Sequence, residues 1–438
     1  MRIVLPDQVS NIINTLEAAG YEAFAVGGCV RDSVLGREPA DWDITTSAKP
    51  EQVKELFERT IDTGIQHGTV TVMMDHVGYE VTTYRIDGEY RDSRHPDEVS
   101  FTSELREDLR RRDFTINAMA YSERTGMVDI FGGMEDLKQG IVRCVGNAME
   151  RFGEDALRIL RAVRFAAQLG FEIEKETREA ASALAQNLQK ISAERIQVEL
   201  VKLLVSPYPQ LLREAWEMGL TRVFFPEFDA MMETTQNHPH HCYTVGEHTL
   251  KALEFVEADK TLRLAVLLHD IAKPVTKTTE QGIDHFYGHA ALGRQMSEKI
   301  LRRLKFDNHT IDCVKKLVQF HDTRPETTDR SVRRLMNRAG EDLLPDLFQV
   351  MGADLLAQSP YMRVEKLLKL DRIREIYEEI LLRGECVSLK TLAVTGRDLT
   401  AAGRKPGRGI GETLQRMLED VLEEPEHNNK EYLLRTYL

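Results

Sequence analysis

Long apolar runs are missing from this chain. No stretch of its 438 residues stays apolar over the length that a membrane-spanning helix needs. The amino-terminal segment, Met1–Pro6, has no apolar run long enough for a signal peptide and soon becomes amphipathic. The sequence therefore predicts no membrane partner.

Cysteine is also scarce. The five cysteines are odd in number, scattered, and free of Cys-x-x-Cys spacing. This pattern favours reduced thiols over a disulfide framework, so we expect a cytoplasmic protein.

Positive charge is in deficit, because the net charge is −13. That balance argues against a nucleic-acid binder whose whole surface is basic, but phosphate contacts need only a local basic stripe. Each stripe can equally be a solvated helix face. Four stripes are present: Arg106, Arg110, Arg111 and Arg112; Arg158, Arg161 and Arg164; Arg302, Arg303 and Lys305; Arg397, Arg404, Lys405 and Arg408.

Strand signals are confined to the first part of the chain. Residues 24–26, 42–44, 69–74 and 79–84 have strand-like composition, and a turn is expected at residues 75–78. Helices are expected at residues 30–35 and 50–59. Residues 88–100 are polar and contain Pro96, which predicts a mobile loop.

From about residue 150 the strand signals stop. Residues 156–169, 175–189 and 193–204 have helical apolar spacing, and nearly everything after them is also helix-like. The predicted fold class is α+β: a small mixed-sheet head, then an all-α neck, body and tail with an all-α domain inserted. The expected boundaries are 1–140 for the head, 141–205 for the neck, 206–237 for the body, 238–345 for the inserted domain, and 346–438 for the body and tail.

A glycine turn and two aspartates in the head indicate phosphate chemistry. Gly27-Gly28 follows a strand and precedes a helix, where backbone N–H groups can approach a phosphate and Arg31 can grip it. Asp41 and Asp43 alternate in strand-like sequence and so point to one face. Two carboxylates there repel each other unless a cation lies between them, and Mg²⁺ with substrate phosphates is the usual solution.

A second pattern suits base recognition. Asp155 and Arg158 are three residues apart on an expected helix from 154 to 164, so they share a face, while Arg164 lies nearly opposite Asp155. A carboxylate beside a guanidinium complements the amine and adjacent acceptor of cytosine and adenine, but not the reversed pattern of uracil and guanine. The same spacing also fits a helix-surface salt bridge.

These motifs together resemble a known family. Residues 25–32 (AVGGCVRD), Leu35-Gly36, Asp41-Trp42-Asp43 and residues 110–119 (RRRDFTINAM) resemble the class II polymerase-β-like nucleotidyltransferases, the class shared by bacterial CCA-adding enzymes and poly(A) polymerases. The resemblance covers about the first 205 residues.

The resemblance implies roles for the head residues. Asp41 and Asp43 would bind the catalytic Mg²⁺, Gly28 and Arg31 the triphosphate, and Arg112 the nucleotide. Spacing alone indicates no third carboxylate, since Asp87 and Asp113 are only weak candidates.

The resemblance extends to the neck and the tail. Residues 154–158 (EDALR) are similar to the family's base-reading motif, which makes Asp155 and Arg158 the base readers, with Arg161 and Arg164 supporting the nucleotide and triphosphate. Residues 192–195 (SAER) are similar to the motif that braces this helix, so Glu194 and Arg195 would be structural. Residues 396–398 and 403–411, ahead of a helix running to about Glu424, would contact tRNA, or form only a helix entry loop.

Histidines and aspartates with ligand spacing occur further along. The pattern is similar to the HD superfamily of metal-dependent phosphohydrolases, and the mixture of His and Asp favours a hydrolytic metal such as Ni²⁺ or Mn²⁺. We place His238, His240 and His241 outside the site. The resemblance implies His248, His269, Asp270 and Asp322 as ligands, with His289 and His321 as candidates for a second metal.

The predicted function is template-independent addition of C, C and A to the 3′ end of tRNA, from CTP and ATP, with Mg²⁺. Expected partners are tRNA, CTP and ATP, and not DNA. Three alternatives stay open: a poly(A) polymerase that uses only ATP, a partial enzyme that adds only CC or only A, and a nucleotide phosphohydrolase whose head is an accessory binding module.

Overall fold

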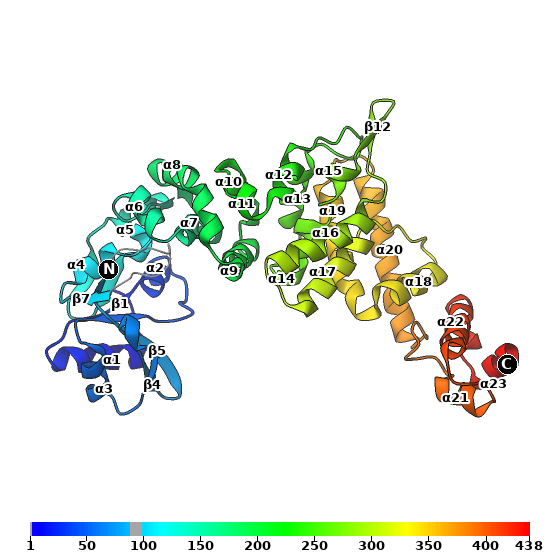
Figure 1. Cartoon of the computed structure of the whole chain (residues 1–438), viewed down its shortest axis with the longest axis horizontal. Helices are drawn as coiled ribbons and strands as arrows, with labels where there is room; N and C mark the ends of the chain where they lie inside the picture. Colours follow the sequence, from blue (N-terminus) through cyan, green and yellow to red (C-terminus); the bar gives the residue numbers. More distant parts are fainter. Residues whose placement is uncertain (1, 88–98) are drawn as a thin grey trace. The chain divides into compact units, whose positions relative to one another are not determined.

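The computed structural model describes residues 2–87 and 99–438. The chain forms two compact units, Met1–Pro226 and Glu227–Leu438 (Figure 1). The loop predicted at residues 88–100 lies outside the described residues, except for its last two positions, which belong to β7 (Val99–Phe101). The predicted α+β class is confirmed, whereas the five-part domain division stays a prediction.

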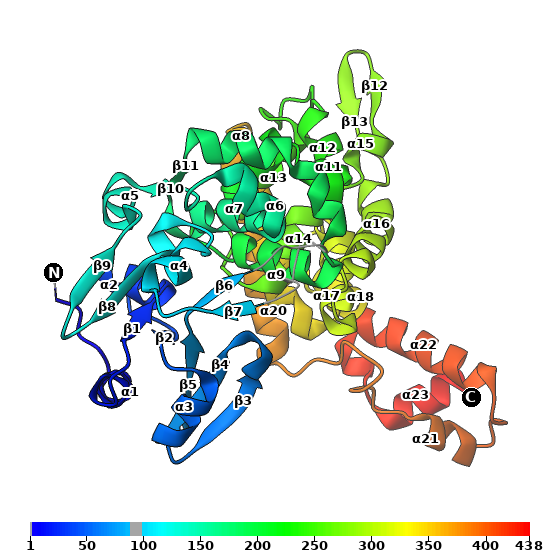
Figure 2. The ribbon, with the colours of Figure 1, turned by 60° about the vertical axis from the view of Figure 1, so that its left-hand side comes forward.

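A seven-stranded mixed sheet forms the centre of the first unit, in the order β3-β4-β5-β2-β1-β8-β9. Strands β2 and β5 pair in parallel, and the other neighbours are antiparallel. Figure 2 shows β3, β4 and β5 side by side. The strands are β1 (Ala23–Val26), β2 (Ile44–Thr46), β3 (Thr60–Gly64), β4 (Thr69–Met74), β5 (Val77–Thr83), β8 (Met119–Ser122) and β9 (Gly126–Asp129).

Two sequence predictions about this sheet need correction. Strand β2 begins at Ile44, so Asp41 and Asp43 lie directly before the strand rather than within it. The turn between β4 and β5 contains only Asp75 and His76, both with positive φ (49° and 67°). A two-residue turn of this kind matches the right-handed twist of a hairpin, which is why β5 starts earlier than predicted.

Helices surround this sheet and continue into the neck. The helix predicted at residues 193–204 is confirmed as α9, while residues 175–189 divide into α8 and a 3₁₀ turn. The helices are α1 (Asp7–Ala18), α2 (Gly28–Val34), α3 (Pro50–Leu56), α4 (Leu105–Arg110), α5 (Gly133–Gln139), α6 (Ala148–Glu154), α7 (Leu157–Leu169), α8 (Lys175–Ala183), α9 (Ala193–Leu204), α10 (Leu212–Glu217) and α11 (Thr221–Phe224).

Short strands occur after residue 150, where none was predicted. Strand β11 (Glu172–Ile173) pairs in parallel with β10 (Ile141–Val142), which directly follows the predicted head boundary. Strands β12 (Thr278–Glu280) and β13 (Ile283–His285) form a hairpin in the second unit. Segments of two or three residues are too short to produce a readable alternation.

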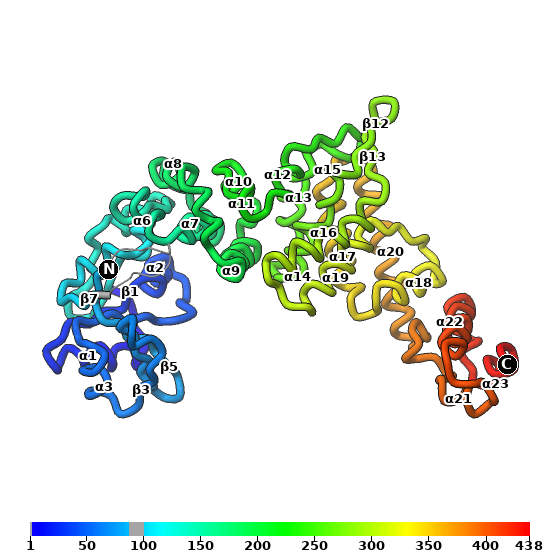
Figure 3. The backbone as a smooth tube through the Cα atoms, viewed as in Figure 1, coloured from blue at the N-terminus to red at the C-terminus, as the bar shows by residue number. Residues whose placement is uncertain are grey.

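The second unit is otherwise helical, and Figure 3 traces its backbone from α12 to α23. Its core includes α14, in which every residue from Leu262 to Leu268 is buried. No helix in the described part of the chain is both long and apolar enough to cross a membrane. The helices are α12 (Pro226–Glu233), α13 (Val245–Leu253), α14 (Lys260–Leu268), α15 (Lys273–Thr276), α16 (His289–Arg303), α17 (Asn308–Phe320), α18 (Asp329–Ala339), α19 (Leu344–Ala357), α20 (Arg363–Leu382), α21 (Gly396–Ala401), α22 (Arg408–Glu423) and α23 (Lys430–Tyr437).

Candidate functional sites

The turn after β1 has a backbone conformation that favours glycine at position 27. Gly27 has φ 84°, and a Cβ atom there would lie 2.9 Å from Nη1 of Arg112. Gly28 starts α2, so its backbone N–H group belongs to the first turn of that helix. The turn therefore brings backbone donors and the Arg112 guanidinium to one place.

Asp41 and Asp43 lie at the edge of this turn. The N–H group of Val26 donates to the backbone oxygen of Asp43 at 3.0 Å, which fixes the segment before β2 against β1. Burial and then the charge of Asp41 raise the pKa of Asp43, while Arg112 acts in the opposite direction. A cation between the two carboxylates would relieve their repulsion, and oxygen-only ligands suit Mg²⁺.

Glu80 is a third carboxylate that the sequence did not reveal. Strand β5 runs parallel to β2 with Ile44 opposite Val81, which sets Glu80 beside Asp43. The charge of Glu80 also contributes to the raised pKa of Asp43. Its strand was predicted, but the pairing of that strand with the aspartate segment could not be read locally.

Asp108 holds two of the three arginines at positions 110–112. This fully buried carboxylate contacts Arg111 at 2.9 Å and Arg112 at 3.8 Å, and it accepts a hydrogen bond from Thr45 Oγ1 at 3.0 Å. Burial lowers the pKa of Arg112, and Asp108 opposes that effect. No local pattern predicts this role for Asp108.

Asp113, a weak candidate for the third carboxylate, contacts arginine instead. It accepts from Arg161 Nε at 2.8 Å and from Asn117 Nδ2 at 3.0 Å. Asn117 in turn accepts from Arg31 Nη1 at 2.7 Å. Arg31 of α2 is therefore linked to Arg161 of the neck through the Asn117 amide and the Asp113 carboxylate.

The neck differs from the continuous helix predicted for residues 154–164. Helix α6 ends at Glu154, Asp155 has extended backbone angles, and α7 begins at Leu157. At this break Asp155 Oδ1 accepts a hydrogen bond from the Leu157 N–H group at 3.0 Å, at the start of α7. Arg195 Nη2 donates to the other Asp155 oxygen at 2.7 Å, a contact that fits its predicted bracing role.

Arg158 and Arg164 occupy different surroundings on α7. Arg158 pairs with Glu154 at 2.7 Å and donates to the backbone oxygen of Arg111 at 2.9 Å. Arg164 is buried against Glu199 at 2.6 Å. Burial lowers the pKa of Arg164 to about 10, against the charge of Glu199.

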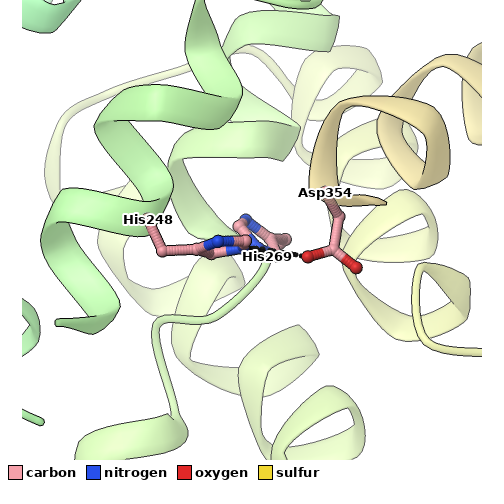
Figure 4. A group of neighbouring side chains, drawn as sticks. All are labelled: His248, His269 and Asp354. Carbon is pink, nitrogen blue, oxygen red and sulfur yellow. Dashed lines mark hydrogen bonds and ion pairs between the residues drawn. The ribbon is translucent and has the colours of Figure 1, made fainter. Parts of the chain in front are cut away.

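The second unit contains a group of three ligand-type side chains. His248, His269 and Asp354 point toward one another from α13, the end of α14, and α19 (Figure 4). Their ligand atoms all lie within 4.8 Å of one another. His248 Nε2 is 2.9 Å from Asp354 Oδ1 and 3.4 Å from His269 Nε2. This spacing would allow one cation to be held by all three.

Asp270, His289 and His321 form a second group beside the first. Asp270 Oδ1 is 3.6 Å from Nε2 of both His289 and His321, whereas Oδ2 is 3.2 Å from His269 Nε2. Asp270 therefore presents one oxygen to each group. Although burial opposes its ionisation, the charges of His269 and Lys273 hold the pKa of Asp270 well below its usual value.

Three of these histidines have their other ring nitrogen occupied. Nδ1 of His269, His289 and His321 donates to the backbone oxygen three residues earlier, at 2.6, 2.8 and 2.7 Å. A proton on Nδ1 leaves the lone pair on Nε2, the atom that faces the group. Metal-binding histidines are commonly oriented in this way, so the donor set fits a metal.

Asp322, predicted as a ligand, lies outside both groups. Helix α17 ends at Phe320, and the Asp322 carboxylate is on the surface at 3.0 Å from Arg324. Asp354 takes its place in the first group. The sequence signal for Asp354 was an acid within the mainly apolar helix 344–357, because acids are rarely placed on the buried face of such a helix.

The histidines before α13, predicted to lie outside the site, line its cavity. A cavity of about 600 Å³ opens beside both groups, and burial lowers the pKa of His241 to about 3. Its wall combines imidazole rings with basic side chains. Among the lining residues are His238, His240, His241, Lys273, Arg324 and Lys366.

Three family profiles match the chain. The one described as "Poly A polymerase head domain" matches residues 23–143, "Probable RNA and SrmB- binding site of polymerase A" matches 170–232, and "tRNA nucleotidyltransferase domain 2 putative" matches 276–436. Together with the carboxylates and arginines of the head, they define a nucleotidyltransferase.

Similar proteins identify the family. A CCA-adding enzyme of Levilactobacillus brevis is 38% identical over 92% of this chain and 90% of its own length. A CCA-adding enzyme of Lactiplantibacillus plantarum is 56% identical, but the match covers 45% of this chain and 49% of that protein. The chain therefore spans about half the length of that relative. The structure of the Bacillus stearothermophilus CCA-adding enzyme in complex with CTP matches with a TM-score of 0.74 and 30% identity, over 99% of this chain and 97% of that one. The chain belongs to the CCA-adding enzymes.

Proposed function

We propose that this chain adds C, C and A to the 3′ end of tRNA from CTP and ATP without a nucleic-acid template, by Mg²⁺-dependent nucleotidyl transfer. The observation that carries the proposal is the head site, where Asp41 and Asp43 lie beside a glycine turn and an array of arginines. Membership of the CCA-adding enzymes over nearly the whole chain supports the choice of tRNA, CTP and ATP.

Each head residue has a part in this reaction. Asp41 and Asp43, with Glu80 as a third carboxylate, would hold Mg²⁺, which lowers the cost of charge developing on the phosphates. Gly28 and Arg31 would bind the triphosphate, Arg161 and Arg164 would support it, and Arg112 would bind the nucleotide. The protein orients the 3′-hydroxyl of tRNA toward the α-phosphate, so catalysis depends mainly on positioning and charge.

Supplying the substrates separately tests the proposal. A tRNA that ends before its CCA sequence is incubated with labelled CTP alone, ATP alone, or both, and product lengths are read on a gel. Three additions ending in A are the expected result. A long A tract would identify a poly(A) polymerase, additions limited to CC or to A would identify a partial enzyme, and no addition would leave the head as a binding module.

Base choice depends on Arg158. Arg158→Ala should reduce the preference for CTP over UTP by roughly 1–3 kcal/mol, because the guanidinium is the forked donor in the proposed base-reading pair. The measurement is competition between CTP and UTP on one tRNA. Arg151→Ala is the matched control, since Arg151 pairs with the same carboxylate, Glu154. Equal selectivity in the two variants would reduce Arg158 to a structural ion pair.

A second candidate function belongs to the second unit. We propose that it is an HD-type metal-dependent phosphohydrolase, with Ni²⁺ or Mn²⁺ held by His248, His269 and Asp354 and a second ion by His289 and His321. Asp270 would bridge them, since its two oxygens face different groups. Imidazole-rich ligand sets favour transition metals, and a metal there would activate water for attack on a phosphate ester.

A further inference from the structure

Three arginines of the head and neck surround a single aromatic ring. The guanidinium carbons of Arg164, Arg31 and Arg161 lie 3.7, 5.0 and 5.4 Å from the centroid of the Phe165 ring. Phe165 is on α7 and is only 5% exposed. All three arginines belong to the set proposed to bind or support the triphosphate, although they come from α2 and α7.

Three like charges in so small a space repel one another and need counter-groups. Arg31 is held by Asp32 and Asn117, Arg161 by Asp113, and Arg164 by Glu199. Carboxylates occupy N–H donors that a phosphate would otherwise use. An aromatic ring holds a guanidinium in a different way from a carboxylate. It attracts the face of the guanidinium and leaves the N–H groups at the edge available for phosphate oxygens.

We propose that Phe165 is a positioning residue for the nucleotide: its ring holds Arg31, Arg161 and Arg164 in the array that receives the triphosphate of both CTP and ATP. The proposal rests on the head site assigned above. It extends that site by a residue that carries no charge and no hydrogen-bonding group. The base is read elsewhere, so the effect of Phe165 is independent of which nucleotide is bound.

Replacing the ring tests this role. Phe165→Leu should raise the KM for CTP and for ATP by about tenfold alike, which corresponds to about 1.4 kcal/mol, and should leave kcat within about twofold. The inhibition constant of inorganic tripolyphosphate, which has no base, should rise by the same factor. Phe165→Tyr keeps a ring and should restore all three constants, while the preference for CTP over UTP stays unchanged.

Two further variants make the outcome decisive. Phe152→Leu removes another fully buried ring of the same unit; in the described parts of the chain no arginine lies over it, so it reports the effect of lost packing alone. Equal tripolyphosphate inhibition constants for Phe165→Leu and Phe152→Leu would overturn the proposal. Phe165→Met replaces the leucine variant if that variant does not fold.

Replacing Arg31 distinguishes a failure of this proposal from a failure of the proposed function on which it rests. Arg31→Met should raise the same constants. If Arg31→Met raises them and Phe165→Leu does not, only the role of Phe165 is wrong. If neither raises them, the triphosphate site itself has been misplaced.

Discussion

Asp43→Ala is expected to abolish incorporation of both C and A, with a fall in kcat/KM of about 1000-fold or more, equivalent to about 4 kcal/mol. In our proposal Asp43 and Asp41 bind the same Mg²⁺. Losing either carboxylate weakens that binding, so the charge on the reacting phosphates is poorly neutralised. Asp41→Ala should have the same effect for the same reason. Single-nucleotide incorporation into tRNA is measured with CTP and with ATP at saturating Mg²⁺.

Controls within the same sheet separate chemistry from folding. Asp62→Ala removes an aspartate of β3 that pairs with Lys54 on the surface, and its activity should match the parent protein. Glu80→Gln should give a smaller loss than Asp43→Ala, since Glu80 is exposed and only adjoins the pair. Near-normal turnover in a folded Asp43→Ala variant would show that the active site lies elsewhere.

The parts of the candidate site that the sequence predicted are those coded by neighbouring residues. Gly27-Gly28 after a strand, followed by Asp41 and Asp43, gives a local signal because each feature depends on a few adjacent positions. The same is true of Arg195, whose predicted bracing role agrees with its 2.7 Å contact to Asp155. Strand β4, confirmed at its predicted bounds, has alternate buried valines, Val70 and Val72.

The missed parts depend on tertiary pairing. Glu80 lies beside Asp43 only because β5 pairs with β2 in parallel. Asp354 joins His248 only because α19 packs near α13, and the intervening sequence contains no spacing that indicates it. At the break, the Asp155 side chain accepts a hydrogen bond from the Leu157 N–H group, a local contact that competes with the helix and that apolar periodicity does not detect.

The two proposed metal sites are drawn from separate units of the chain. Every head carboxylate precedes Pro226, and every histidine of the second-unit groups follows it. Their ligand types differ as well, oxygen-only in the head and mixed imidazole and carboxylate in the second unit. Different ligand chemistry implies different metal preferences, so each site should be removable without the other.

Replacing His269 and Asp270 together should therefore end hydrolysis and leave CCA addition in place. The change removes one ligand of the first group and the carboxylate that faces both groups. Hydrolysis of p-nitrophenyl phosphate and bis(p-nitrophenyl) phosphate with Ni²⁺ or Mn²⁺ should fall to background, and calorimetric titration with Mn²⁺ should lose its binding heat. Incorporation of C and A should stay within about threefold of the parent, or about 0.7 kcal/mol.

Single variants then decide between the two aspartates. Asp354→Asn should weaken Mn²⁺ binding and hydrolysis about as severely as the double variant, by 10-fold to 100-fold or more, because it replaces a charged ligand atom of the first group. Asp322→Asn should change neither, since that carboxylate contacts Arg324 on the surface. Both activities are measured on one preparation of each variant, with thermal unfolding as the check on folding. Loss of CCA synthesis in a folded double variant would mean that the two sites are coupled, and an effect of Asp322→Asn equal to that of Asp354→Asn would refute the ligand set.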